Sequence, residues 1–188
     1  MERDEAKRQV FLEQLAKIDP DNIVYADDAG MDNRDDYGYG WNKRGERFHA
    51  LKVGQRQGRV NMIAAYCNRQ LFAPFTIVGA CNRAVFETWI EKCLMATLKP
   101  GQWLVIDNAT FHERFREEFF PPKLSHKGGR IEALLEQVGC KVLYLPPYSP
   151  DLNKIENCWS WLKSRIRHCK SEFDCFRDAM EYVLRLAS

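Results

Sequence analysis

Two acidic residues each follow a short apolar run and could take part in metal-dependent phosphate chemistry. Asp27 follows the apolar residues 23–26, and Asp107 follows residues 103–106, so each acid is expected at the end of a buried strand. Asp28 comes directly after Asp27, but successive strand residues point to opposite faces, so only one of the two can face a shared site. Carboxylate oxygens are ligands that suit Mg²⁺ and Mn²⁺.

A third acid, Glu156, is expected in the first turn of a strongly basic helix. Three prolines between positions 146 and 150 exclude an earlier start of that helix, and a short strand over residues 142–145 leads into the turn. The spacing of Asn153 and Glu156 also fits a capping box, in which Asn153 caps the helix and the glutamate bonds back to the cap residue. Glu156 is therefore either a helix cap or the third member of an acidic site.

Three converging carboxylates would need a cation. Two unit charges about 4 Å apart repel by about 4 kcal/mol at an effective dielectric near 20. Two divalent ions about 3.5–4 Å apart reverse this repulsion, and they can hold the attacking and leaving oxygens of a phosphoryl displacement. The acids together predict phosphodiester hydrolysis or transfer.

Three motifs occur in order along the chain. They are YADDAG, which contains Asp27, VIDNATFH, which contains Asp107, and LPPYSPDLNKIE, which ends at Glu156. With these motifs the sequence resembles the DDE transposases, specifically the bacterial insertion-sequence family 630 within the mariner-like superfamily, from about residue 10 to residue 170. The resemblance implies an α/β fold of the RNase H-like type, with a mixed β-sheet flanked by helices.

The resemblance also implies the chemistry and the ligands. It aligns the first catalytic acid with Asp27, so Asp28 is expected to be solvated or to support the site. Asp27 would bridge two Mg²⁺ or Mn²⁺ ions, while Asp107 and Glu156 would each hold one. The implied reaction is DNA strand cleavage followed by transfer of the 3′-hydroxyl into target DNA. The implied partners are double-stranded DNA, as transposon ends and a TA target, and a second copy of the chain in a synaptic dimer.

Three further residues are auxiliary candidates. His112, in the DNATFH motif that the family shares, could move a proton or orient substrate, or it could be a helix-start histidine. Asn108 is either a strand-end hydrogen-bonding residue or a partner of a metal ligand. Asn153 is the third candidate, through its place in the turn before Glu156.

Two basic segments flank the acidic centre and suit a phosphate backbone. Residues 42–59 carry six basic residues against one acid, and residues 152–170 carry five against one. Such charge gives salt-dependent and sequence-independent affinity for nucleic acid, although solvated charge runs are also common on protein surfaces. The predicted DNA-binding residues are Lys43, Arg44, Arg47, Lys154, Lys163 and Arg167.

Aromatic residues accompany both basic segments. Trp159 is expected on one helical stripe with Glu156, Lys163 and Arg167, while Trp161 and Ile166 face elsewhere; both tryptophans are interpreted as core anchors. Residues 37–41, with sequence YGYGW, could stack on unpaired bases or form a hairpin with one packed face.

The chain is interpreted as one compact domain. Residues 1–20 are expected to form an amphipathic helix that ends at Asp19 and Pro20, and residues 21–188 to form the catalytic domain. Relatives carry helix-turn-helix modules before this domain, and the sequence has no room for one before its first predicted strand. We therefore expect a separately encoded helix-turn-helix protein or a truncated remnant. Residues 116–129 read as an inserted loop.

The remaining elements fit a layered α/β domain. Strands are predicted over residues 59–67 and 71–78, and helices over residues 85–98 and 131–138. A final amphipathic helix is predicted around residues 173–184.

Composition narrows the class of protein. With 188 residues, of which 45% are hydrophobic, the chain can bury a substantial core, and it lacks the long apolar run of a membrane span. Seven cysteines without a CxxC pair are expected to be free thiols, so a cytoplasmic, nucleoid-associated protein is predicted. Zinc binding by Cys158, His168, Cys169 and Cys175 is disfavoured because the ligand spacing is absent.

Two other functions fit the same residues. A structure-specific nuclease or junction resolvase of this fold would cut DNA but never join strands. A non-catalytic remnant would bind DNA without cutting it. An intact set of three acids favours an enzyme.

Overall fold

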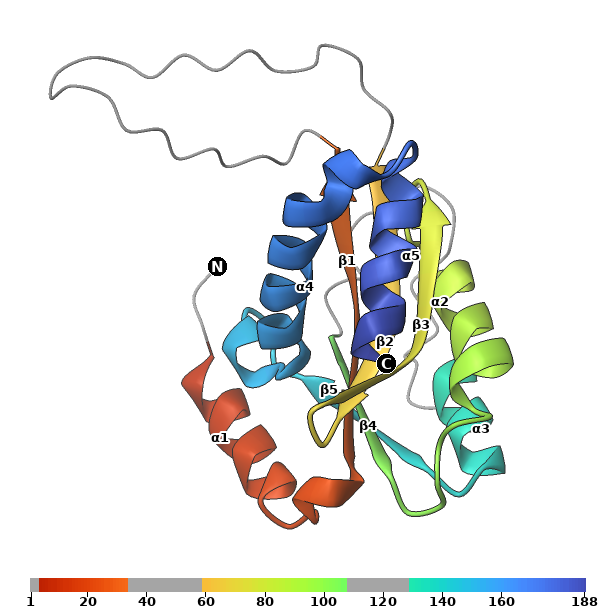
Figure 1. Ribbon diagram of the computed structural model, residues 1–188. Coiled ribbons are helices and arrows are strands. Elements are labelled where there is room, and N and C mark those ends of the chain that lie inside the picture. The colour runs from red at the N-terminus through yellow and green to blue at the C-terminus, as the bar shows by residue number, and fades with distance from the viewer. Residues whose placement is uncertain (1–3, 34–58, 108–128) are drawn as a thin grey trace, which may run out of the picture.

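The fold is a mixed five-stranded sheet with helices on both faces. The computed structural model describes residues 4–33, 59–107 and 129–188 (Figure 1). In chain order its main elements are α1 (Glu5–Leu15), β1 (Ile23–Asp32), β2 (Arg59–Cys67), β3 (Gln70–Val78), α2 (Arg83–Trp89), β4 (Trp103–Asp107), α3 (Arg130–Gln137), β5 (Lys141–Leu145), α4 (Ile155–Cys169) and α5 (Phe176–Ala187). A π-helical segment, Ile90–Leu94, continues α2, and short 3-10 turns occupy Pro20–Asn22, Pro150–Leu152 and Lys170–Glu172.

The strands lie in the order β3-β2-β1-β4-β5. β1, β2 and β3 form an antiparallel meander, whereas β4 and β5 run parallel to β1. Parallel strands require crossover connections, and helical segments supply them: α2 with its π-helical continuation precedes β4, and α3 precedes β5. The predicted α/β class and mixed sheet are confirmed.

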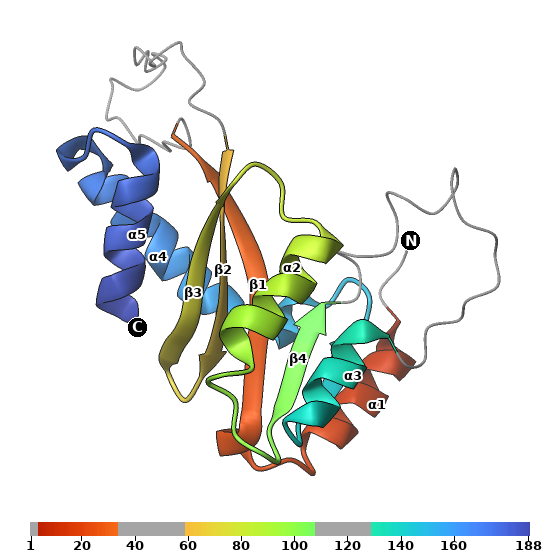
Figure 2. The ribbon, with the colours of Figure 1, turned by 90° about the vertical axis from the view of Figure 1, so that its right-hand side faces the viewer.

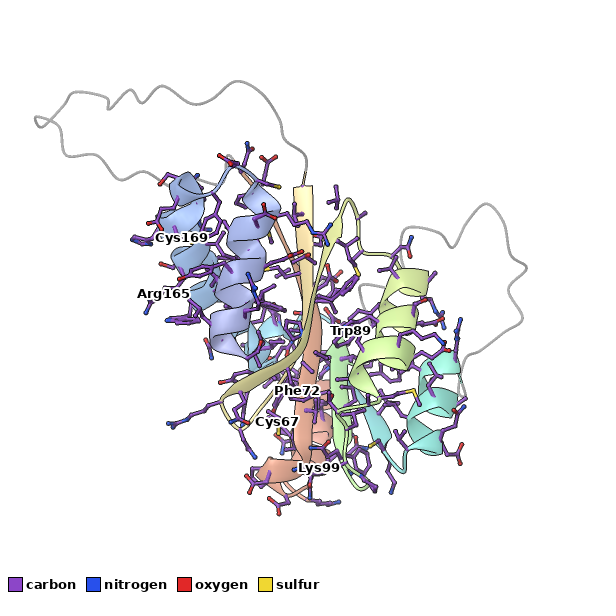
Figure 3. All side chains as sticks on the ribbon, turned by 45° about the vertical axis from the view of Figure 1, so that its right-hand side comes forward. Cys67, Phe72, Trp89, Lys99, Arg165 and Cys169 are labelled. Carbon is purple, nitrogen blue, oxygen red and sulfur yellow. The ribbon has the colours of Figure 1, made fainter. Side chains whose placement is uncertain are left out.

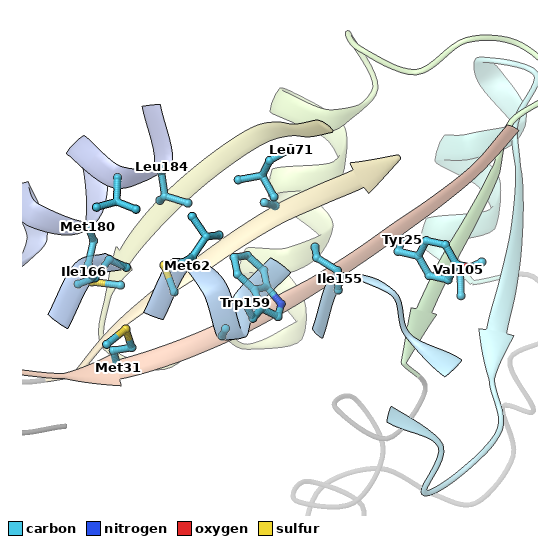
Figure 4. Close-up of a cluster of buried hydrophobic side chains, with 14 of the residues drawn as sticks. Tyr25, Met31, Met62, Leu71, Val105, Ile155, Trp159, Ile166, Met180 and Leu184 are labelled. Atoms are coloured by element: carbon cyan, nitrogen blue, oxygen red, sulfur yellow. The ribbon is translucent and has the colours of Figure 1, made fainter. Parts of the chain in front are cut away.

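Each face of the sheet has its own hydrophobic core. The first core lies between the sheet and α1, α4 and α5, and Figure 4 shows Ile155 and Trp159 of α4 in it, over β1. The second core lies between the sheet and α2 and α3, and it includes Trp89, whose position between α2 and the strands is visible in Figure 3. Figure 2 shows α4 and α5 on one side of β1–β3 and α2 on the other. Alternate residues of each central strand enter opposite cores, as the pleat requires.

Strand β1 is longer than predicted. The prediction that it ends at the acidic pair is wrong, because it continues through Asp27 and Asp28 to Asp32. Its antiparallel pairing with β2 extends from Tyr25 to Asp32, whereas its parallel pairing with β4 covers only residues 23–25. The acids therefore lie where the pairing of β1 with β4 has ended and its pairing with β2 continues.

Several predicted boundaries shift for local reasons. α1 ends at Leu15, earlier than predicted, because the Asp19 side chain instead accepts a hydrogen bond from the Asp21 amide and begins a separate turn. α2 begins at Arg83, since the Asn82 side chain accepts from the Val85 amide at 3.0 Å and caps it. The strand over residues 59–67 is confirmed as β2.

The chain ends in α5, which contains most of the predicted amphipathic residues. Phe173 precedes the helix rather than belonging to it, and its ring lies 5.3 Å from that of Tyr182. All seven cysteines are free thiols, as predicted. Within the described ranges, no helix is both long enough and apolar enough to span a bilayer.

Candidate active site

Asp27 and Asp107 lie on the same face of the sheet. The residues two positions before them, Tyr25 and Val105, belong to the core beneath α4, and these two residues are paired in the parallel register of β1 and β4. Because side chains alternate along a strand, Asp27 and Asp107 point to the side of the sheet that α4 covers, at the same level. Asp28 points to the opposite side, as expected if Asp27 is the acid of the shared site.

Glu156 reaches this region from the first turn of α4. Ile155 beside it is fully buried in the core that also contains Tyr25 and Val105, so the start of the helix is anchored against the sheet. Glu156 itself is exposed, so its carboxylate stays accessible to ligands. The start of α4 therefore holds a carboxylate next to the ends of β4 and β5.

The capping box predicted as the alternative role of Glu156 is absent. The cap position is Lys154, which makes no side-chain cap, and the Glu156 amide bonds to the Asn153 backbone carbonyl at 3.1 Å. The Asn153 side chain is 3% exposed and turns inward, where its Nδ2 donates to Asp27 Oδ2 at 3.2 Å. The asparagine thus contacts the first acid instead of capping the helix.

The electrostatics of the site are clearest at Asp27. Burial raises the pKa of Asp27 from its ordinary 3.8 to about 8, and the negative charges of Asp28, Glu156 and Asp107 add to the increase. A hydrogen bond from the Asp28 amide to Asp27 Oδ1, at 2.8 Å, acts in the opposite direction. Ionising Asp27 is thus unfavourable in the protein alone, and a nearby cation would relieve that cost.

Asp28 has different surroundings. Burial raises its pKa as well, but the positive charges of Arg59 and Lys163 act to lower it. Asp28 is therefore compensated by basic residues, whereas the charged neighbours of Asp27 are acids.

The donor set fits Mg²⁺ or Mn²⁺. All candidate ligands are oxygen atoms, and the Asn153 Oδ1 beside Asp27 is buried without a hydrogen-bond partner among the described residues. In residues 4–33, 59–107 and 129–188, no three Asp, Glu, His or Cys side chains are spaced closely enough to form a coordination sphere. The three carboxylates share one region of the α4 face, but they lie farther apart than the ligands of a single ion.

The predicted DNA-binding residues divide into two groups. Lys43, Arg44 and Arg47 lie outside the described residues, as do the auxiliary candidates Asn108 and His112 and the YGYGW segment. The other three lie on or beside α4: Lys154 is exposed with its Nζ 5.7 Å from the centre of the Tyr25 ring, and Lys163 and Arg167 are half-buried.

The predicted stripe on α4 is partly wrong. Trp159 does not face the same way as the charged residues, because it is 1% exposed and shares the core with Ile166. Trp161 is 46% exposed and is not a core anchor; the Arg165 guanidinium lies 5.2 Å from its ring, on the outward side of α4 (Figure 3). Glu156, Lys163 and Arg167 therefore form a charged stripe beside the buried one.

Sequence reasoning missed one contact that holds the turn before α4. Arg8 of α1 makes two hydrogen bonds to the Asp151 carboxylate, at 3.1 and 2.7 Å. The two residues are far apart in the sequence, so no local pattern indicates the pair. Among the residues of the disfavoured zinc site, His168 has its Nδ1 2.7 Å from the Ser164 carbonyl oxygen.

Comparisons with solved structures support the predicted fold. The Mos1 transposase paired-end complex with left transposon end matches with a TM-score of 0.62 and 13% identity, over 96% of this chain and 52% of that chain. The Mos1 strand transfer complex matches with a TM-score of 0.63 and 14% identity, over 95% and 51%. A simian T-cell lymphotropic virus intasome matches with a TM-score of 0.52 and 10% identity, over 88% and 47%. The RNase H-like fold is thereby confirmed.

The sequence comparison identifies the family. The chain spans about half the length of the Mos1 chains in these complexes. A comparison with curated protein sequences gives no match. Residues 22–179, which include all three candidate acids, match the family described as DDE superfamily endonuclease. The chain therefore belongs to the DDE superfamily endonucleases.

Proposed function

We propose that this chain is the catalytic domain of a cut-and-paste DNA transposase of the insertion-sequence family 630 type. The observation that carries the proposal is geometric: Asp27 on β1, Asp107 at the end of β4 and Glu156 at the start of α4 lie on the side of the sheet that α4 covers. Burial, together with the charges of the neighbouring acids, raises the pKa of Asp27, and such a buried group of acids is typical of a centre that binds metal ions. The Mos1 neighbours support a transposase, since they include a strand transfer complex and a paired-end complex with Mn.

Asp27, Asp107 and Glu156 would hold two Mg²⁺ or Mn²⁺ ions. When bound, the ions would activate the attacking water or 3′-hydroxyl and stabilise the leaving oxygen. The Asp28 amide and the Asn153 side chain fix both oxygens of Asp27, so its carboxylate does not need to reorganise. Lys154, Lys163 and Arg167 would attract the DNA backbone to the same side of the sheet.

The proposed partners follow from the same likeness. They are double-stranded DNA as transposon ends and target, a second copy of the chain in a synaptic dimer, and a separately encoded helix-turn-helix protein. Mos1 was solved bound to a transposon end, which supports DNA as the substrate.

Metal-dependent cleavage and joining of DNA would test the proposal. Duplexes that end in candidate terminal repeats would be incubated with Mg²⁺ or Mn²⁺ and the chain, together with any helix-turn-helix protein encoded beside it. Asp27→Asn, Asp107→Asn and Glu156→Gln should each abolish both reactions, while Glu136→Gln, at an exposed position of α3, serves as the control.

Each result separates the proposal from its rivals. Cutting and joining that every triad substitution removes would support a transposase. Cutting without joining would instead indicate a nuclease or resolvase. DNA binding with neither reaction would indicate a non-catalytic remnant.

A further inference from the structure

The turn that precedes α4 is held from several directions. Asp151 faces outward and is bound by Arg8 of α1, while Asn153 faces inward and bonds to Asp27. Ile155 is fully buried in the core beneath α4. Asp151, Asn153 and Ile155 are thus fixed to three different parts of the molecule. These contacts determine the position of the next residue, Glu156, in the first turn of α4.

Asn153 links the turn before Glu156 to Asp27 on β1. Its Nδ2 donates to Asp27 Oδ2 at 3.2 Å, while Asp27 Oδ1 accepts from the Asp28 amide at 2.8 Å. Each oxygen of the Asp27 carboxylate therefore has one donor, the first from the turn and the second from its own strand. A carboxylate held in this way has a defined orientation, and its remaining lone pairs stay available to a ligand.

The other half of the Asn153 amide does not contribute a hydrogen bond. Its Oδ1 is buried without a partner among the described residues, and the side chain is 3% exposed. A buried carbonyl oxygen without a donor lowers the stability of the fold. Stability alone is therefore a poor explanation for an asparagine here, whereas an orienting contact to Asp27 explains it.

We propose that Asn153 is a positioning residue that fixes the Asp27 carboxylate relative to Glu156 before metal ions bind. This inference rests on the proposed function, because it assumes that Asp27 and Glu156 are metal ligands. Residues that orient a metal ligand through a hydrogen bond commonly change metal affinity or activity by about 10- to 100-fold when they are removed. Loss of Asn153 should weaken metal binding by a factor of this size.

Two substitutions separate the hydrogen bond from packing. Asn153→Ala removes the side chain, and Asn153→Leu keeps its branched shape but has no donor. The control is Asn157→Ala, at an exposed position of α4. Binding of Mn²⁺ to the full chain would be measured from the electron paramagnetic resonance signal of free Mn²⁺, and near-UV circular dichroism would verify folding.

Both Asn153 variants are expected to bind Mn²⁺ about 10- to 100-fold more weakly than the wild type, and Asn157→Ala about as tightly. DNA cleavage by the Asn153 variants should recover as the Mn²⁺ concentration is raised, which a general loss of folding would not produce. If folded Asn153→Ala and Asn153→Leu bind Mn²⁺ within about twofold of the wild type, the positioning role is wrong.

A measurement on the wild type keeps the test decisive if both variants fail to fold. The side-chain amide resonance of Asn153 should shift when Mg²⁺ is added, while that of Asn157 should not. Equal behaviour of the two resonances would overturn the inference.

The wild type and Asp27→Asn distinguish this inference from the proposed function. If the wild type binds no Mn²⁺, or Asp27→Asn binds it as tightly, the metal site itself is wrong. If Asp27→Asn loses binding and the Asn153 variants keep it, only the positioning role fails.

Discussion

The buried polar groups on the two faces of the sheet differ in how many have hydrogen-bond partners. On the side of α2 and α3, the Trp89 indole donates to the Ala73 carbonyl at 2.8 Å, and Glu87 accepts from Arg83 at 2.7 Å. Tyr144 on the same side donates its hydroxyl to Glu132 at 2.6 Å. The Trp89 and Tyr144 contacts join a helix to a strand, the Glu87 contact lies within α2, and all three stabilise that half of the protein.

The side beneath α4 contains buried polar atoms that have no hydrogen-bond partner among the described residues. Within the described ranges, the Tyr25 hydroxyl, the Asn153 Oδ1 and the Trp159 indole nitrogen are buried without hydrogen-bond partners. Asp27 on this side is surrounded by acids, and its pKa rises to about 8. Native proteins rarely leave buried polar groups unpaired without a functional reason. The other side is not free of such groups, because Glu132 Oε2 of α3 is also buried without a partner among the described residues. Under the proposed function, the groups beneath α4 would gain partners when a cation and a substrate bind.

The largest expected difference between the faces is in DNA cleavage, when Asp27 and Asp28 are each replaced by asparagine. Asp27→Asn should reduce Mn²⁺-dependent DNA cleavage by more than about 100-fold, since it removes a proposed metal ligand rather than a partner of one. Asp28→Asn, on the other face, should reduce it by less than about tenfold. Initial cleavage rates on one duplex substrate would measure both. A loss for Asp28→Asn as large as for Asp27→Asn would contradict the assignment of the site to the α4 face.

The pH dependence of stability gives the next largest effect. The folded protein holds a proton on Asp27 up to about pH 8, whereas the unfolded chain loses it near the ordinary pKa of 3.8. The contribution of Asp27 to the free energy of unfolding therefore falls as pH rises from about 4 to about 8. Asp27→Asn lacks this loss, so its stability relative to the wild type should increase over that range by at least about 1.4 kcal/mol.

Urea unfolding with a chelator present, at pH 4.5 and pH 8.5, would measure this difference. The same difference at both pH values would show that Asp27 titrates normally. Addition of Mg²⁺ at pH 8.5 should then stabilise the wild type and leave Asp27→Asn unchanged.

The smallest expected effect is a difference in stability between two tyrosine substitutions, one on each face of the sheet. Tyr144→Phe removes the hydroxyl that donates to Glu132, and it should lower the free energy of unfolding by about 1 kcal/mol. Tyr25→Phe removes a buried hydroxyl that has no partner in the described part of the chain, so it should change stability by less than about 0.5 kcal/mol or increase it. Chemical unfolding of both variants would measure the difference. An equal loss of unfolding free energy in both variants would mean that the Tyr25 and Tyr144 hydroxyls are hydrogen-bonded equally well.

Much of the fold could be predicted because its signals are local. Apolar runs between turn residues predicted β2, β4 and β5, and the prolines before Asp151 placed Glu156 in the first turn of α4. The extent of β1 could not be predicted, because its second half depends on pairing with β2 rather than on its own residues. In the same way, the outward position of Trp161 depends on how α4 packs against the sheet.

The candidate site was predictable in its acids but not in its supporting contacts. Each acid follows a recognisable element, and the three motifs that contain the acids occur along the chain in the order that the family shares. The bonds from Asn153 to Asp27 and from Arg8 to Asp151 join residues far apart in the sequence, where spacing carries no information. Local spacing even favoured the wrong interpretation of Asn153, as a helix cap.

The placement of the three acids along the chain has a consequence for biosynthesis. Asp27 lies on β1, whereas Glu156 lies in the first turn of α4, 129 positions later in the sequence. The ribosome releases the sheet-forming segments well before it releases α4, and a domain folds as a unit only when its partners are available. A nascent or prematurely terminated chain would therefore lack the complete acidic centre.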